Sequence, residues 1–367
     1  MSVPPRMVRR IVFAPAMLLI TFLVLTTVPA WGLFALAVSP LVPGKLRPLR
    51  VLWLVAVYLI TESLGLLASF ALWVASGFGA LYRTERFETL HYRLLAWAVT
   101  FIYRNAVRVL KVSIEIEQVD EHDASPIESR RPLLVFCRHA GPGDSFLLLH
   151  EVIVRLGRRP RIVMKDLLQF DPMLDVVLNR LPNQFVASTP GSSKAMVRAV
   201  QTLAEDMDER DALVLFPEGS NFTPKRRLRA IERLRSLGHQ DEASTASEMT
   251  RVLPPRPGGA LAAIAANPQT DILLVAHTGL EHMSGPRDLW RGLPMDTPIK
   301  AAWWLEPEED VPSDPDEQVD WLFANWKRID SWISANEMGP DAEEGRQELP
   351  GSSSRGRRTR GSDNAGR

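Results

Sequence analysis

Two long apolar runs dominate the first third of the chain. No charged side chain occurs from 11 to 39, and Glu62 is the only one from 51 to 82. A helix needs about 20 mainly apolar residues to cross a bilayer, and soluble core helices rarely run this long without charge. A secretory signal has a shorter apolar core and is not followed by a second long run. We therefore predict that residues 1–111 form a helical membrane anchor.

The path of these runs is open from the sequence. Pro15 and Pro29 interrupt the first run, which could therefore kink or fold back as a shallow hairpin. Arginines precede the first run, separate the two runs and follow the second, so the positive-inside rule finds no asymmetry. Two spans with both ends in the cytoplasm and two re-entrant hairpins both fit.

A third helix with one apolar face is predicted over 87–110. Phe87, Leu90, Leu94 and Phe101 recur at helical spacing there, with arginines among them. Such a helix could lie in the headgroup region of a membrane. An ordinary helix that packs on the following domain would show the same pattern.

From residue 112 the pattern becomes that of a globular domain, which we place at 112–338. Short apolar runs alternate with longer segments of helical periodicity, and this alternation predicts an α/β fold, with a mixed sheet flanked by helices. Asp314 and Pro315 are the N-cap and first residue of the last predicted helix. The expected strands lie at 112–116, 133–137, 162–164, 213–216, 272–276 and 301–305.

Charge and cysteine content narrow the classes of function. Acidic and basic side chains balance at 43 each, which gives no bulk electrostatic reason to expect a nucleic-acid partner. A single cysteine, Cys137, excludes an internal disulfide and a cysteine zinc cluster. The last segment, 339–367, is basic and rich in glycine and serine, so we predict a disordered tail.

The first candidate for chemistry follows the predicted strand at 133–137. His139 and Asp144 are five positions apart, which on one continuous helix would separate them by about 140°. Gly141 and Gly143 flank a proline and make a turn more favourable there. Asp144 could then hydrogen-bond one imidazole nitrogen of His139, leaving the other to take a proton from a hydroxyl. A His–Asp pair without an evident serine suits a reaction whose nucleophile is the substrate's alcohol.

The second candidate follows the strand at 213–216. Pro217-Glu218-Gly219 predicts a turn that projects Glu218 and backbone N–H groups from the edge of a sheet. Lys225, Arg226 and further arginines come next. Such a group is able to bind phosphate, although a run of arginines alone is more often a solvated helix face.

These motifs resemble the glycerophospholipid acyltransferase family, which includes the 1-acylglycerol-3-phosphate acyltransferases. That family carries His-x4-Asp and, further along, Phe-Pro-Glu-Gly-Thr-Arg; here His139-x4-Asp144 is followed by Phe216-Pro217-Glu218-Gly219-Ser220-Asn221. Phe222-Thr223 and Pro255-Arg256-Pro257-Gly258-Gly259 are similar to later blocks, and Lys165 with Leu168 and Pro172 to an intermediate one. The resemblance covers roughly 131 to 276.

The resemblance implies a mechanism and a set of site residues. His139 would be the general base that deprotonates an acceptor hydroxyl, and Asp144 would orient it. The acyl donor would be acyl-CoA or an acyl carrier protein, the acceptor a lysophospholipid, and no metal or other cofactor is implied. The family also implies a protein at the lipid bilayer of the cell membrane, with the catalytic domain on the cytoplasmic face. The residues expected to bind substrate are Lys165, Phe216, Pro217, Glu218, Gly219, Ser220, Arg226 and Arg256.

Two departures bear on the acceptor. The family's Thr-Arg is Ser220-Asn221 here, and no arginine follows Phe185 where the family's middle block has one. Phosphatidic acid synthesis from 1-acylglycerol-3-phosphate is the first expectation, and another lysophospholipid head group, a transacylase reaction and a non-catalytic membrane homologue are the alternatives. A hydrolase with Ser145 as nucleophile is excluded, because no aspartate is followed by histidine three positions later.

Overall fold

The computed structural model describes residues 3–44, 46–118, 126–127, 129–187, 193–281 and 298–337, together with residues 290, 293 and 295. Its first part contains two long apolar helices. The segments Arg6–Leu41 and Arg47–Ala75 are each long and apolar enough to cross a membrane, judged by length and composition. The elements within them are α1 (Arg6–Val8), the π-helix η1 (Arg9–Phe13), α2 (Ala14–Val38), the 3-10 helix η2 (Ser39–Leu41) and α3 (Arg47–Ala75).

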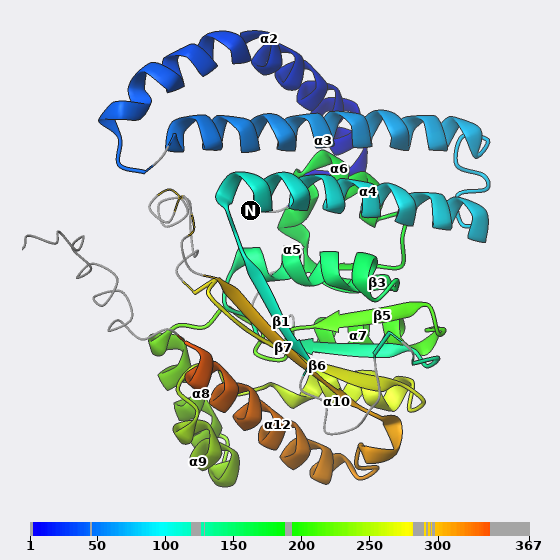
Figure 1. Cartoon of the computed structure of the whole chain (residues 1–367). Coiled ribbons are helices and arrows are strands. Elements are labelled where there is room, and N and C mark those ends of the chain that lie inside the picture. Colours follow the sequence, from blue (N-terminus) through cyan, green and yellow to red (C-terminus); the bar gives the residue numbers. More distant parts are fainter. Residues whose placement is uncertain are drawn as a thin grey trace, which may run out of the picture.

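The first apolar run is one curved helix. α2 continues through Pro29 without a break, and Figure 1 shows it bending above α3. The shallow hairpin considered for this run is therefore wrong. Proline removes one backbone hydrogen bond and bends a helix, but it does not have to end one.

The third helix packs on the domain. α4 (Glu85–Leu110) contacts both α3 and α5 (Pro142–His150). Its buried face includes Phe87, Tyr92, Leu95 and Val99. Of the two interpretations of this amphipathic segment, the structure shows the helix packed between the apolar helices and the domain.

The domain is built on one seven-stranded sheet. Its order is β1-β7-β6-β2-β5-β3-β4, and every neighbouring pair is parallel except β6 and β7. The prediction of an α/β fold with a mixed sheet is thus confirmed. The short β4 was not among the expected strands. The strands are β1 (Ile114–Gln118), β2 (Leu133–Cys137), β3 (Arg159–Lys165), β4 (Gln184–Val186), β5 (Asp211–Leu215), β6 (Asp271–Thr278) and β7 (Ile299–Glu306).

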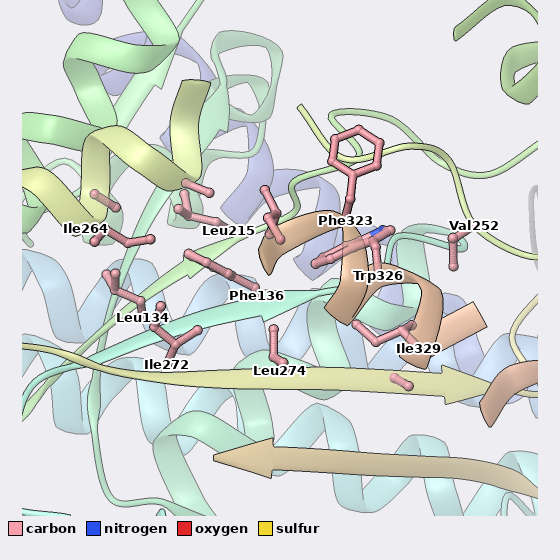
Figure 2. Packing of buried hydrophobic residues seen from close by; sticks show 14 of the residues in the cluster. Leu134, Phe136, Leu215, Val252, Ile264, Ile272, Leu274, Phe323, Trp326 and Ile329 are labelled. Atoms are coloured by element: carbon pink, nitrogen blue, oxygen red, sulfur yellow. The ribbon is translucent and has the colours of Figure 1, made fainter. Parts of the chain in front are cut away.

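Helices cover both faces of the sheet (Figure 1). One face packs on α5 and the π-helix η3 (Glu151–Arg155), beyond which lie α4, α3 and α2. The other face packs on five helices, and Figure 2 shows Phe136 of β2 near Phe323 and Trp326 in this layer. These helices are α7 (Ser193–Glu205), α8 (Pro224–Ser236), α9 (Gln240–Glu248), α10 (Pro257–Ala266) and α12 (Pro315–Asn336).

Polar contacts fix the apolar helices to the domain through α6 (Pro172–Leu178). Arg9 donates to Asp175 Oδ1 from Nη2 at 2.7 Å and from Nε at 3.1 Å, and the Asp175 carboxylate is buried. Gly65 of α3 lies so close to α6 that an added Cβ would overlap the Met173 side chain. These contacts pack the apolar helices against the domain.

The C-terminal part of the domain agrees with the sequence. Asp314 accepts hydrogen bonds from the Asp316 and Glu317 N–H groups, as an N-cap does, and α12 begins at Pro315. The proposed limits of the anchor and the domain, 1–111 and 112–338, stay predictions. The tail at 339–367 lies outside the described residues.

Candidate active site

The candidate residues meet at one edge of the sheet. β2 lies between β6 and β5, and these three strands are parallel. Their carboxyl ends therefore point the same way, which is where open α/β sheets bring functional loops together. His139 follows β2, Glu218 follows β5, and His277 belongs to the end of β6.

His139 and Asp144 form a direct pair. The chain leaves β2, turns at Gly141 and enters α5, so Asp144 lies in the first turn of that helix. Asp144 Oδ2 is 3.0 Å from His139 Nδ1 and also accepts the N–H groups of Ala140 at 2.7 Å and Gly141 at 2.9 Å. With Nδ1 engaged, Nε2 is the nitrogen of His139 left to accept a proton.

The charge of Asp144 is stabilised by its surroundings. Burial opposes ionisation of this carboxyl, but the hydrogen bond from His139 and the electrostatic effect of the neighbouring His277 and His139 rings hold its pKa below the usual range. Its second oxygen accepts the N–H and hydroxyl of Ser145. The Ser145 hydroxyl thus supports Asp144.

Glu218 does not project from the sheet edge, and that expectation is wrong. It is 1% exposed, and its two oxygens accept the N–H groups of His139 and Leu253, each at 3.0 Å. The turn aims the side chain inward because these two buried N–H groups need an acceptor. Burial raises the pKa of Glu218 to about 8, against the opposing effect of these two hydrogen bonds. Glu218 therefore holds the backbone of His139.

Gly219 and Arg256 lie in direct contact beside the pair. Gly219 has a φ of 69°, and a Cβ there would lie 3.1 Å from Arg256 Nη1. The Arg256 N–H donates to the Pro217 carbonyl at 2.9 Å, which ties this loop to the turn after β5. Partial burial and the charge of Arg233 lower the pKa of Arg256. Two neighbouring guanidinium groups favour an anion between or beside them.

Phe216 and the other residues predicted to bind substrate differ in their distance from His139 and in their exposure. The Phe216 ring lies 4.5 Å from the His139 ring, and Pro217 is buried in the turn that follows. Ser220 is half-buried near the same turn, and Arg226 donates to the Asn221 carbonyl at 3.0 Å. Lys165 is exposed at the carboxyl end of β3, one strand beyond β5. Their roles in binding substrate stay predictions.

Two neighbours of the pair were not singled out from the sequence as functional. His277 is 6% exposed, with Nε2 at 3.2 Å from the Arg138 carbonyl and 3.7 Å from Asp144 Oδ2. Because both are acceptors, Nε2 carries the proton. Burial lowers the pKa of His277 to about 4, so this ring is neutral at pH 7.

Arg138, the residue before His139, supports the same loop. It is 1% exposed and donates to the His277 carbonyl at 2.7 Å and to the Glu281 carboxylate. An arginine at the end of an apolar strand is the sequence signal for this role, since a buried charge needs partners. Arg138 and His277 join the ends of β2 and β6.

An apolar cavity lies beside Asp144. It holds about 50 Å³ of free space on the sheet face covered by α5, and Asp144 and His277 belong to its wall. Most of the remaining wall is hydrocarbon from β1, β2, β6, β7 and α5. A cavity of this composition suits an aliphatic chain. Representative lining residues are Leu147, Val152, Leu273, Val275, Ala301 and Trp303.

Cys137 and the groups able to bind a metal ion are the remaining candidates for chemistry. Burial raises the pKa of the Cys137 thiol well above its usual value, and the side chain is 1% exposed, which argues against a nucleophile. Within the part of the chain that the structure describes, no three His, Cys, Asp or Glu side chains are gathered in a way that could hold a metal ion.

The comparisons with known proteins agree with this site. Residues 118–277 match a family model whose description is "Acyltransferase". The match contains the His139–Asp144 pair and the turn at Glu218, and it supports an acyltransferase domain in this part of the chain. The searches of curated proteins and of solved structures gave no match.

Proposed function

We propose that the protein is a membrane-bound acyltransferase that moves a fatty acyl group from a thioester donor to the free hydroxyl of a lysophospholipid. The donor is acyl-CoA or an acyl carrier protein, and the first acceptor to test is 1-acylglycerol-3-phosphate, which would give phosphatidic acid. The observation that carries the proposal is the direct His139–Asp144 pair, in which the buried Asp144 belongs to the wall of an apolar cavity.

The proposed reaction uses His139 as base and then as acid. Nε2 takes the proton of the acceptor hydroxyl while the oxygen attacks the thioester carbon, and Asp144 stabilises the imidazolium that forms. Collapse of the tetrahedral intermediate breaks the carbon–sulfur bond. The imidazolium then returns the proton to the leaving thiolate, so the products are an ester and a free thiol. No metal or redox cofactor is needed for this sequence.

The two ends of the substrates find different surroundings. The apolar cavity supports the acyl chain, because it offers hydrocarbon contacts on the sheet face that points toward α3 and α2. Gly219 and Arg256 support a phosphate group on the acceptor, since Gly219 is exposed and the Arg256 guanidinium lies against it. Ser220 and Asn221 replace the family's Thr-Arg, so another phosphate-bearing lysophospholipid is the second candidate.

The apolar helices support a location at the membrane. α2 leaves many large apolar side chains exposed, among them Leu19, Phe22, Leu33 and Phe34. Exposed apolar surface of this extent is stable in contact with lipid and costly in water. We propose the cell membrane as the location, with the catalytic domain on the cytoplasmic face.

The test is release of CoA by the purified, detergent-solubilised protein from palmitoyl-CoA or oleoyl-CoA. We expect release that requires lysophosphatidic acid and falls about 10²–10⁴-fold in His139→Ala, as loss of a general base does. Release without acceptor that survives the substitution would indicate a thioesterase and refute the mechanism. If lysophosphatidic acid fails, other lysophospholipids with the same donor decide between a different head group and a non-catalytic protein.

A further inference from the structure

Four arginines gather around one carboxylate where η1 meets α6. Arg9 Nη2 lies 2.7 Å from Asp175 Oδ1, and Arg10 Nε lies 3.7 Å from Oδ2 of the same carboxylate. Arg6 and Arg180 are close enough to Arg10 for the three positive charges to act on one another. Of the acidic residues that the structure describes, only Asp175 forms an ion pair with any of the four arginines. The junction therefore carries a surplus of positive charge.

Much of the hydrogen-bonding capacity of this cluster is unused. Arg10 Nε and Nη2 are buried and have no hydrogen-bond acceptor among the described residues. Arg180 Nη1 donates to the Ser69 carbonyl at 2.8 Å and to His91 Nε2 at 3.0 Å. His91 Nδ1 donates to the Phe87 carbonyl at 2.6 Å, so Nε2 is the acceptor and the ring is neutral. Neither partner of Arg180 offsets its charge.

The cost of this arrangement is evident at Arg180. Burial, followed by the charges of Arg10 and Arg6, lowers the pKa of Arg180 to about 10. Guanidinium groups that are withdrawn from water are normally paired with an anion, because an unpaired buried charge is costly. The planar fork of arginine matches the oxygen atoms of a phosphate. The cluster therefore has the composition of a site for a phosphate group.

Exposed apolar side chains lie beside the cluster. Met7 is 68% exposed and Ile11 is 63% exposed, and each follows one of the arginines at the beginning of the first apolar segment. Basic residues at the end of a membrane helix lie at the depth of the lipid head groups, where they attract anionic lipids. A phosphate at this place therefore suits a phospholipid, whose acyl chains would contact Met7 and Ile11.

The cluster is distinct from the candidate active site. It is formed by η1 and by Arg180 in the segment after α6, with contacts to α3 and α4. The candidate active site lies where β2, β5 and β6 end, and the two sites share no residue. α6 contacts α3 and η1, and Figure 1 shows α6 next to α3. A lipid bound here would connect the first apolar segment to the domain.

We propose that Arg6, Arg10 and Arg180 bind the phosphate of an anionic phospholipid from the surrounding bilayer, in a site separate from the one for acyl transfer. The phosphate supplies the acceptor that the unused guanidinium N–H groups lack, and its charge offsets the surplus around Asp175. Because the lipid links η1 to the segment after α6, it stabilises the packing of the apolar helices on the domain. Binding at this site does not depend on the acyl transfer proposed above.

The experiment measures how lipid stabilises the full-length protein in a non-ionic detergent. Tm is followed by circular dichroism while phosphatidylglycerol, phosphatidylcholine or inorganic phosphate is added. The test variants are Arg10→Gln/Arg180→Gln and Arg6→Gln, the second of which removes an exposed side chain that no described residue pairs with. The matched control is Arg104→Gln/Arg108→Gln, which removes two exposed arginines from α4, the helix that packs on α3.

We expect phosphatidylglycerol to raise Tm of wild type by a few degrees, as a ligand that binds only the folded state does. Phosphatidylcholine and inorganic phosphate should raise it much less. Arg6→Gln should need about tenfold more phosphatidylglycerol for half of the effect, as for one lost charge-assisted hydrogen bond. Arg10→Gln/Arg180→Gln should lose the effect, and the control should titrate as wild type.

Each of the other outcomes overturns a stated part of the proposal. Equal loss in the control would show attraction of basic residues to anionic lipid in general, and an Arg6→Gln variant that titrates as wild type would exclude the site. Equal stabilisation by inorganic phosphate would assign the site to a free anion, and equal stabilisation by phosphatidylcholine would exclude recognition of the negative charge. If Arg10→Gln/Arg180→Gln does not fold, Arg6→Gln and the control decide.

Native mass spectrometry gives a reading that does not depend on Tm. We expect wild type and the control to retain one molecule of phosphatidylglycerol when the detergent is removed, and Arg6→Gln to retain it in a much smaller fraction of molecules. No lipid retained by wild type would overturn the site, and the acyl transfer proposed above would be unaffected by that result.

Discussion

The two faces of the central sheet are covered by layers of different chemistry. On one face, α5 encloses the apolar cavity, and α4, α3 and α2 follow in that order outward. On the other face, one of the covering helices is α8, with six basic residues and one acidic residue. His139 lies where β2 ends between these two layers. The comparison indicates that the sheet separates an apolar layer from a layer with a basic helix, and that the candidate base lies at the edge between them.

The largest effect is expected from removing the negative charge of Asp144, which lies at the edge between the two layers. Every contact of Asp144 Oδ2 is with a donor, including His139 Nδ1 and two backbone N–H groups. Asp144→Asn places an amide among donors and loses the negative charge, so we expect kcat to fall about 10²-fold or more.

Ser145→Ala is the matched control for that substitution. It removes a hydroxyl from the other oxygen of Asp144 and leaves the pair intact. We expect acyl transfer within a few-fold of wild type. A Ser145→Ala variant as inactive as Asp144→Asn would contradict the assigned roles.

A second prediction sharpens the apolar side of the comparison. Ala301 lies on β7 in the wall of the cavity, and Ala301→Phe adds a ring to its free space. We expect transfer of palmitoyl to fall about tenfold, which corresponds to a loss of one to two kcal/mol of apolar burial, while a short acyl chain is much less affected. Rates over a series of acyl-CoA chain lengths measure this. Equal loss at every length would place the acyl chain elsewhere.

A third prediction concerns the neutral histidine that joins β6 to the loop of the base. His277→Leu removes the Nε2–H that faces the Arg138 carbonyl and Asp144, whereas His277→Gln retains an N–H donor. We expect kcat to fall about fivefold in the leucine variant, as for one lost hydrogen bond, with KM unchanged. The glutamine variant should recover most of the activity. If both variants lose the same activity, the imidazole ring and not its N–H is required.

The smallest predicted effect is on stability against pH. Glu218 has a pKa of about 8 in the folded protein, raised by burial, and an ordinary acidic pKa when unfolded. Between these values the unfolded chain has released a proton that the folded chain keeps, so rising pH favours unfolding. From pH 6.5 to 8 the unfolded chain also releases the remaining part of the His277 proton, which favours folding but is a smaller effect than that of Glu218. Tm of wild type should therefore decrease by a few degrees over this range.

Glu218→Gln removes this titrating group and leaves one of its two acceptors. We expect a lower Tm for this variant at neutral pH, because one buried N–H loses its partner. Its Tm should change less than that of wild type between pH 6.5 and 8. An equal slope in both proteins would show that Glu218 is not the group responsible.

The sequence predicted the parts of the site that depend on local pattern. The strand before His139 is a run of five apolar residues, and a Gly-Pro-Gly turn after it leaves few paths for the chain. The pairing of His139 with Asp144 follows from that short turn. The inward direction of Glu218 does not, because its acceptors serve two N–H groups that are 79 and 35 residues away.

Long-range contacts explain the other differences. β4 has three residues and exists through its pairing with β3, which no pattern of its own indicates. His277 is brought to Asp144 by the adjacency of β6 and β2, strands whose residues are more than a hundred positions apart. The path of α2 through Pro29 depends on how neighbouring segments support a bent helix.

The single cysteine makes the centre of the sheet accessible to measurement. Cys137 ends the central strand and is 1% exposed. Cys137 also belongs to the wall of the apolar cavity. A thiol reagent therefore reaches it when the cavity or the fold around β2 opens, and the rate of labelling under native conditions reports that opening. A new cysteine at an exposed position of α8 would by contrast react without any opening of the fold. The labelling rate of this single thiol can therefore be measured without removing other cysteines.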